Sequence, residues 1–269
     1  MMLFIKAFII GIAKIIPGVS GAMLAINFKI YEKLIYSLTN FFSKPKENLK
    51  FILIFSLGVI SSIILFSNII LYLITNYKFI TMMFFIGLII GGSYNFSKNI
   101  KYNYKNIILI SIIIILFLFL IFNTNNNIYI LKNNYKDNIM FFISGIIEIF
   151  ASIVPGISGT SLLMLIGIYN EILKLISMVY DINYIFNHYN LYLSYGLGMF
   201  ISFIINIYLI NYCLKKYRNT TYSVILGLSI SSIIYLIINT LNIKIYITNF
   251  IFGIMLLVLG MLLSSILDK

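Results

Sequence analysis

Apolar residues form long runs along the chain, separated by short polar loops. A helix that crosses a bilayer needs about 20 mostly apolar residues. Runs near this length fall at 51–75, 79–97, 106–123, 191–213, 221–240 and 246–267. Two further apolar segments, 3–28 and 139–166, are interrupted by Pro17-Gly18 and Pro155-Gly156. The pattern predicts an all-α polytopic membrane protein that contains two broken helices.

The composition supports the same class. Hydrophobic residues make up 61% of the 269 residues and charged residues 10%, with a mean hydropathy of +1.05. A soluble domain is about 45–50% apolar and about 25% charged, so lipid must solvate much of this surface. We expect residues 1–269 to form a single integral membrane domain.

The charge of +12 does not indicate nucleic-acid binding. The cations lie in short loops between apolar runs, where they set orientation and meet anionic headgroups. Membrane lipids are therefore the expected partners. The single Cys213 and the single His188 exclude an intrachain disulfide, a cysteine metal cluster and a multi-histidine site. No metal and no cofactor is predicted, and the oligomeric state is left open.

The order of these segments occurs twice. Residues 16–21 (IPGVSG) match residues 154–159 (VPGISG) at an offset of 138 residues, and further matches, such as Leu57-Gly58 with Leu197-Gly198, follow at an offset of 140. A register that drifts so little indicates a duplication. The predicted units are a first repeat at 1–124, an Asn-rich linker at 125–138 and a second repeat at 139–269.

The positive charges distinguish two topologies. If both broken segments turn back inside the membrane, the loops at 43–50, 98–105 and 215–218 share one side with nine cations, against four on the other. If both segments span, the count is seven against six. The positive-inside rule favours the first arrangement. Each repeat then has a re-entrant hairpin and about three crossings, so the repeats are inverted and both termini are cytoplasmic.

The broken segments carry the chemistry expected of an anion site. Proline stops a helix, glycine permits a positive φ, and serine caps the next half-helix. Paired half-helix N-termini present unpaired N–H groups to an anion such as phosphate. The candidate residues of the two turns are Pro17, Gly18, Ser20, Gly21, Pro155, Gly156, Ser158 and Gly159. The alternative is that both turns are packing hinges with no ligand.

Two charged residues lie inside the same segments. Lys14 precedes the first turn and is a candidate to neutralise a substrate phosphate, or it snorkels to the interface or pairs with an acid. Glu148 precedes the second turn. It is the candidate partner of Lys14 in a structural salt bridge, or it carries the proton or cation that couples transport to a gradient. The residues leave both alternatives open.

No catalytic pattern occurs in the sequence. There is no His/Asp/Ser arrangement, no arginine cluster for phosphoryl transfer and no Walker-type glycine loop. We therefore expect a protein that is not an enzyme.

The motifs resemble those of a known family. Residues 11–21 (GIAKIIPGVSG), followed by Tyr31-Glu32, resemble the first signature of the bacterial polyprenyl-phosphate transporters, once catalogued only as a membrane domain of unknown function. Residues 153–159 (IVPGISG), followed by Gly167-Ile168-Tyr169, are similar to the second signature. Lys14 stands where such proteins usually carry Asn, Ala22 where Gly is usual, and Lys29 replaces the glycine that Gly167 preserves.

The resemblance implies a flippase in the multi-pass cytoplasmic membrane of a bacterium. Its substrate is a polyprenyl-phosphate lipid, undecaprenyl phosphate, which it returns from the outer to the inner leaflet for cell-wall synthesis. The hypothesis is alternating access of the phosphate headgroup to a site between the two turns, driven by a proton or cation gradient. The alternatives are a secondary transporter of a small soluble anion and a membrane scaffold that transports nothing.

Overall fold

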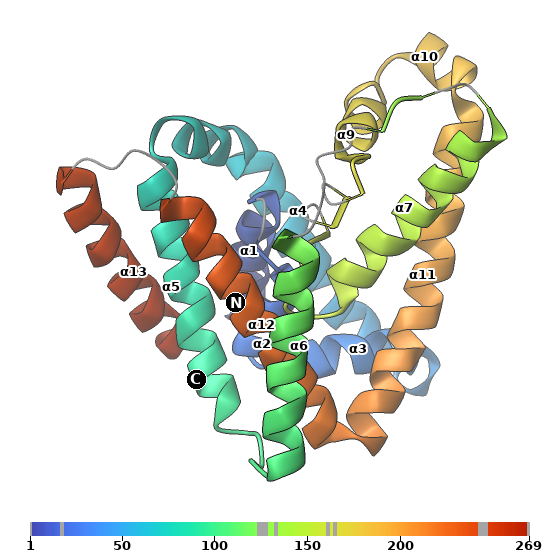
Figure 1. Cartoon of the computed structure of the whole chain (residues 1–269). Helices are drawn as coiled ribbons and strands as arrows, with labels where there is room; N and C mark the ends of the chain where they lie inside the picture. The colour runs from blue at the N-terminus through green and yellow to red at the C-terminus, as the bar shows by residue number, and fades with distance from the viewer. Residues whose placement is uncertain are drawn as a thin grey trace.

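The computed structural model describes residues 2–16, 19–122, 129–131, 134–159, 162–163, 166–241 and 247–267. These residues form helices and connecting turns, with no strand among them. The helices are α1 (Met2–Ile15), α2 (Gly21–Asn27), α3 (Tyr31–Thr39), η1 (Phe41–Ser43), α4 (Pro45–Asn76), α5 (Lys78–Ser97), α6 (Tyr104–Phe122), α7 (Tyr135–Ile153), α9 (Tyr169–Ser177), α10 (Ile182–Asn187), α11 (Tyr189–Lys216), α12 (Arg218–Leu241) and α13 (Ile247–Leu267). In Figure 1, α3 lies at the end of the molecule opposite to α9 and α10.

Five of these helices are long and apolar enough to cross a membrane. They are α5, α11, α12, α13 and the first part of α4, Pro45–Phe66. A shorter apolar stretch lies in α6 at Tyr104–Phe119. The chain is therefore an all-α polytopic membrane protein, as the hydrophobic pattern predicts.

Two helix pairs pack through equivalent glycines. A Cβ atom at Gly58 of α4 would lie 2.8 Å from the carbonyl oxygen of Phe4 and 3.2 Å from the amide nitrogen of Phe8, both in α1. At Gly198 of α11 it would lie 2.1 Å from the carbonyl oxygen of Phe142 and 3.3 Å from the nitrogen of Ile146, both in α7. The contacts fall at the sequence offsets of 138 and 140. The pairs α1–α4 and α7–α11 thus pack in one register.

The remaining long helices pair across the two halves of the chain. Gly87 of α5 packs against the carbonyl group of Leu257 in α13, and Gly260 of α13 packs against that of Phe84 in α5. Gly227 of α12 likewise contacts Ile110 and Ile113 of α6. Each pair takes one helix from each half, so the halves interlock. The inverted relation of the repeats remains a prediction.

Two of the basic loops lie together on one face. The backbone N–H of Lys101 donates to Asn219 Oδ1 over 2.7 Å, and Asn219 Nδ2 donates to the carbonyl oxygen of Lys101 over 2.9 Å. Arg218 reaches Glu32 of α3 on the same face. The topology in which both broken segments turn back stays a prediction.

Helix α7 begins at Tyr135, inside the segment expected as a linker at 125–138. The reason is a capping box: the Asn134 side chain caps the first turn, and the Asp137 carboxylate accepts from the Asn134 N–H over 3.2 Å. Tyr129 donates to the same carboxylate over 2.7 Å. Residues 125–128 and 132–133 of the expected linker lie outside the described residues.

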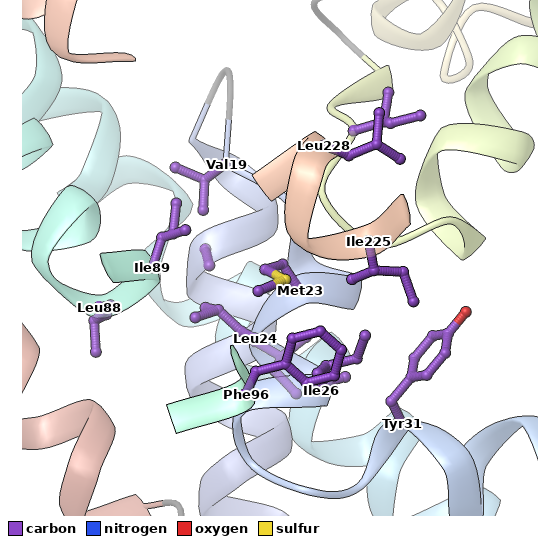
Figure 2. Close-up of a cluster of buried hydrophobic side chains, with 14 of the residues drawn as sticks. Val19, Met23, Leu24, Ile26, Tyr31, Leu88, Ile89, Phe96, Ile225 and Leu228 are labelled. Carbon is purple, nitrogen blue, oxygen red and sulfur yellow. The ribbon is translucent and has the colours of Figure 1, made fainter. Parts of the chain in front are cut away.

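The short helix α2 lies in the middle of the core. Met23 and Leu24 are fully buried. Figure 2 shows them between Ile89 of α5 and Ile225 of α12. A seven-residue helix cannot span a membrane, so α2 is held in place by the long helices around it.

Candidate anion site at the two turns

The first turn joins two helices that run in opposite directions. Gly21, the first residue of α2, lies against Ile10 and Lys14 of α1. At the other end of α2, Lys6 Nζ donates to the carbonyl oxygen of Phe28 over 3.0 Å. Helix α2 therefore folds back along α1 as a hairpin. Pro17 and Gly18 lie outside the described residues.

Ser20 caps the returning helix, as the sequence predicts. Its Oγ accepts a hydrogen bond from the Met23 N–H over 3.4 Å. Ser20 and Gly21 are both buried. The cap satisfies one of the N–H groups that a helix start leaves unpaired.

The second turn is built on a glycine in the left-handed region. Gly156 has φ +90°, and a Cβ atom on it would lie 2.9 Å from both Leu228 Cβ and the Ser229 nitrogen of α12. The Ser232 hydroxyl donates to the Gly156 carbonyl oxygen. Pro155 and Ser158 are buried beside it. Glycine is required at residue 156 both for its φ and for this close approach of α12.

The two turns meet. The Gly156 N–H donates to Ser20 Oγ over 3.3 Å, in a buried hydrogen bond between residues 136 positions apart. Ser229 strengthens the junction from α12, because its hydroxyl lies 2.9 Å from Met23 Sδ. The structure therefore brings a serine of the first turn and a glycine of the second into direct contact, at the centre of the described helices.

The two charged candidates flank this junction without pairing. Lys14 is exposed and its aliphatic stem lies against Gly21. Glu148 lies against Gly159, and its carboxylate accepts a hydrogen bond from the Tyr195 hydroxyl of α11. No ion pair joins Lys14 to Glu148 among the described residues. The predicted alternative of a Lys14–Glu148 salt bridge is thus not formed in this structure.

Several residues that contact the two broken segments were not identified from the sequence. The Tyr31 hydroxyl donates to the carbonyl oxygen of Ile153, the last residue of α7, over 2.7 Å. Lys6 is only 8% exposed and binds the end of α2. The charge of Lys6 inside an apolar segment is the same signal that identified Lys14. Ser229 and Ser232 carry a weaker signal, as hydroxyls in the apolar α12.

The described residues contain no group of three His, Cys, Asp or Glu side chains arranged to hold a metal ion. The junction itself offers backbone N–H groups and serine hydroxyls, and the aliphatic stem of Lys14 packs against Gly21 beside it. These groups suit an anion with several acceptor oxygens.

A family model described as undecaprenyl phosphate translocase-like matches residues 10–250. The chain belongs to this family. The match includes both turns, which confirms the resemblance that the two motifs indicate. This translocase-like chain is 26% identical over 249 residues to the polyprenyl-phosphate transporter of Staphylococcus aureus, covering 85% of this chain and 83% of the relative. It is 24% identical over 246 residues to the polyprenyl-phosphate transporter of Vibrio cholerae, covering 86% and 75%. No solved structure matches the chain significantly.

Proposed function

We propose that the chain is a flippase that returns undecaprenyl phosphate from the outer to the inner leaflet of the bacterial cytoplasmic membrane. The lipid is then reused in cell-wall synthesis. The family description and the names of the two relatives support a polyprenyl-phosphate substrate and a transporter rather than an enzyme. The contact between Ser20 and Gly156 is the observation that carries the location of the site.

The proposed site lies between the two turns. Bound phosphate replaces Ser20 as the acceptor for the Gly156 N–H and accepts from the hydroxyls of Ser20 and Ser158. A phosphate monoester carries about −1.5 to −2 charges at neutral pH, so its passage through the bilayer without a protein is very slow. The exposed ammonium of Lys14 offsets part of this charge. The isoprenoid tail remains in lipid throughout.

Alternating access then requires the two turns to separate and rejoin. The hydrogen bond between Ser20 and Gly156 describes the joined arrangement. Glu148 lies beside Gly159 of the second turn, and its carboxylate carries the proton or cation whose inward gradient drives the cycle. The paired turns thus hold the headgroup while Glu148 couples its movement to the gradient.

The decisive experiment measures lipid movement in liposomes. Purified protein is reconstituted with undecaprenyl phosphate in the outer leaflet, and an added phosphatase reports the lipid that stays accessible. The variant Ser20→Ala/Ser158→Ala is expected to lose most of the movement. Ser111→Ala, an exposed hydroxyl of α6 bonded to its own helix, is the matched control and retains it. Equal movement by both variants, at equal thermal stability, would contradict the proposal.

The same liposomes address the soluble-anion alternative. Uptake of radiolabelled inorganic phosphate at a rate comparable to lipid movement would favour a small-anion transporter. The proposal predicts no such uptake above empty liposomes.

The proposed orientation has its own test. With both termini cytoplasmic, α10 faces the outside. In a Cys213→Ala background, Asn187→Cys is expected to react with an impermeant thiol reagent added to intact cells, and Lys101→Cys only after permeabilisation. The reverse labelling pattern would overturn the orientation.

A further inference from the structure

A pocket of about 700 Å³ lies on the face that carries the two basic loops. It is lined by the start of α3, the loop after α5 and the start of α12. Three of its lining residues are cations, Lys29, Lys101 and Arg218, and Glu32 is the one acid among them. The pocket therefore has an excess of positive charge, and its charged residues are not part of the two turns.

The loop that carries Lys101 is hydrogen-bonded to the start of α12. Lys101 and Asn219 exchange two hydrogen bonds, of 2.7 and 2.9 Å, between the loop and the first turn of α12. Asn106 Nδ2 adds a third bond to the Lys101 carbonyl oxygen, over 3.0 Å. This arrangement fixes the backbone of Lys101 beside the start of α12, where Arg218 lies, so an anion that binds both residues does not first have to order the loop.

Arg218 is oriented but not saturated. Its Nη2 donates to Glu32 Oε1 over 2.9 Å, and its Nε and Nη2 donate to the Tyr222 hydroxyl over 3.3 and 3.1 Å. Nη1 has no hydrogen-bond partner within the described part of the chain. A guanidinium presents its N–H groups in a planar fork that matches phosphate. Glu32 and Tyr222 hold one edge of this fork and leave the other for a ligand.

Two residues that line the pocket belong to or contact the segments that carry the turns. Ile26, which lines it, lies six residues after Ser20, a distance of about 9 Å along α2. Tyr31, which also lines it, donates to the carbonyl oxygen of Ile153 just before the second turn. The pocket therefore lies about one length of α2 from the junction.

We propose that the pocket binds a phosphate monoester, as a second position for the headgroup of the transported lipid. Arg218 Nη1 and Lys101 Nζ donate to the phosphate oxygens, and Asn219 is the positioning residue for Lys101. This inference rests on the proposed function, in which the face of the basic loops is cytoplasmic and the pocket is where the headgroup arrives. Free phosphate has the same chemistry, so the test separates the two sources.

The test is equilibrium binding to purified full-length protein in nanodiscs, with radiolabelled inorganic phosphate and radiolabelled farnesyl phosphate as probes. Lys101→Gln/Arg218→Gln is expected to weaken binding of both probes about tenfold, because it removes two charge-assisted donors. Lys105→Gln/Lys215→Gln removes two exposed charges from the same face without touching the pocket and is expected to bind as the wild type does. Arg218→Lys keeps the charge but not the fork and is expected to lie between them.

Each outcome has a defined meaning. Wild-type binding by the pocket variant overturns the inference, and so does equal weakening by the control variant, which would indicate a general effect of charge. Tighter binding of farnesyl phosphate than of inorganic phosphate supports the lipid headgroup, and the reverse order overturns that source. The variant Ser20→Ala/Ser158→Ala serves as a separate arm. If it still moves lipid, the proposed site at the turns fails; if the wild-type protein moves no lipid, the proposed function fails, whatever the pocket variant does.

Discussion

The two turns share a glycine that packs against the preceding helix, and they differ in the charge beside it. In the first copy Gly21 packs against Ile10, and in the second Gly159 packs against Glu148 at the equivalent position. The residue on the neighbouring helix also changes from apolar to polar. Phe55 of α4 corresponds to Tyr195 of α11, and the Tyr195 hydroxyl donates to Glu148. Conversely, Lys14 of the first copy corresponds to Ser152 of the second.

The comparison shows which features occur in both copies and which in one: the glycine contacts occur in both, and each charge occurs in one. The glycine contacts set how closely the helices approach, and they recur in both halves. The charges are not needed for that packing. In the proposed mechanism the two charges give the turns different roles: Lys14 offsets the charge of the phosphate, and Glu148 carries the coupling ion.

The largest expected effect tests the shared packing. Gly198→Ala places a Cβ 2.1 Å from the carbonyl oxygen of Phe142, and Gly58→Ala places one 2.7 Å from Ala7 Cβ. Gly198→Ala pushes α11 away from α7, and Gly58→Ala pushes α4 away from α1. We expect each change to lower the free energy of unfolding by about 3 kcal/mol, with Gly198→Ala the more severe. Thermal unfolding in detergent measures the effect.

Gly196→Ala is the control for this pair. Nothing lies within 4 Å of a Cβ at this position, so the change is expected to be neutral or slightly stabilising. A loss of stability at Gly196 equal to that at Gly198 would break the comparison, because the cost would then not come from the helix contact.

The second prediction concerns the polar pair of the second copy. Tyr195→Phe removes the hydroxyl that donates to Glu148 and is expected to cost about 2 kcal/mol, because the carboxylate loses its donor. Glu148→Ile/Tyr195→Phe installs the residues of the first copy and is expected to recover most of that loss. A double-mutant cycle of unfolding free energies measures the coupling. Additive losses would show that the two side chains act independently.

The third prediction separates the two charges by function. Lys14→Gln is expected to raise the KM for undecaprenyl phosphate about tenfold, equivalent to about 1.4 kcal/mol, with little change in the maximal rate. Glu148→Gln is expected to leave KM unchanged and to abolish the dependence of the rate on an imposed proton or sodium gradient. Liposome flux with and without a gradient measures both. Identical phenotypes would remove the division of roles.

The smallest expected effect tests the backbone after each half-helix. Lys29 has φ +58° and Gly167 has φ +77°, so both copies use the left-handed region at the corresponding position. Gly167→Ala is expected to cost about 1 kcal/mol, and Lys29→Gly to be neutral or stabilising by up to about 1 kcal/mol. Unfolding midpoints measure these shifts. A stabilising Gly167→Ala would contradict the assignment.

The sequence predicted the class, the broken helices and the family, because these depend on local hydrophobicity and on two short motifs. The sequence also predicted that Gly18 and Gly156 make turns. The structure confirms the turn at Gly156, where φ is +90°, and Gly18 lies outside the described residues. The bond from Gly156 to Ser20 could not be predicted, since it depends on how α7 docks on the first hairpin. The start of α7 at Tyr135 was not predicted, because the Asn-rich stretch was interpreted as a linker although Asn134 and Asp137 form a capping box there.

The partners of the charged side chains could not be predicted from the sequence either. Spacing made Glu148 the apparent partner of Lys14, but Tyr195 of α11 occupies the carboxylate. Arg218 and Glu32 lie 186 positions apart and join only when the halves interlock. Long-range contacts of this kind follow from the helix pairing across the halves and not from any local pattern.

The central claim is that a phosphate headgroup occupies the junction of the two turns. Its most direct test is the reaction rate of Ser20→Cys, in a Cys213→Ala background, with a charged methanethiosulfonate reagent in nanodiscs. Undecaprenyl phosphate is expected to slow labelling of Cys introduced at Ser20 by at least tenfold, while undecaprenol, which lacks the phosphate, does not. Ser111→Cys is expected to react equally with and without either lipid. Equal protection by both lipids, or by neither, would contradict the account.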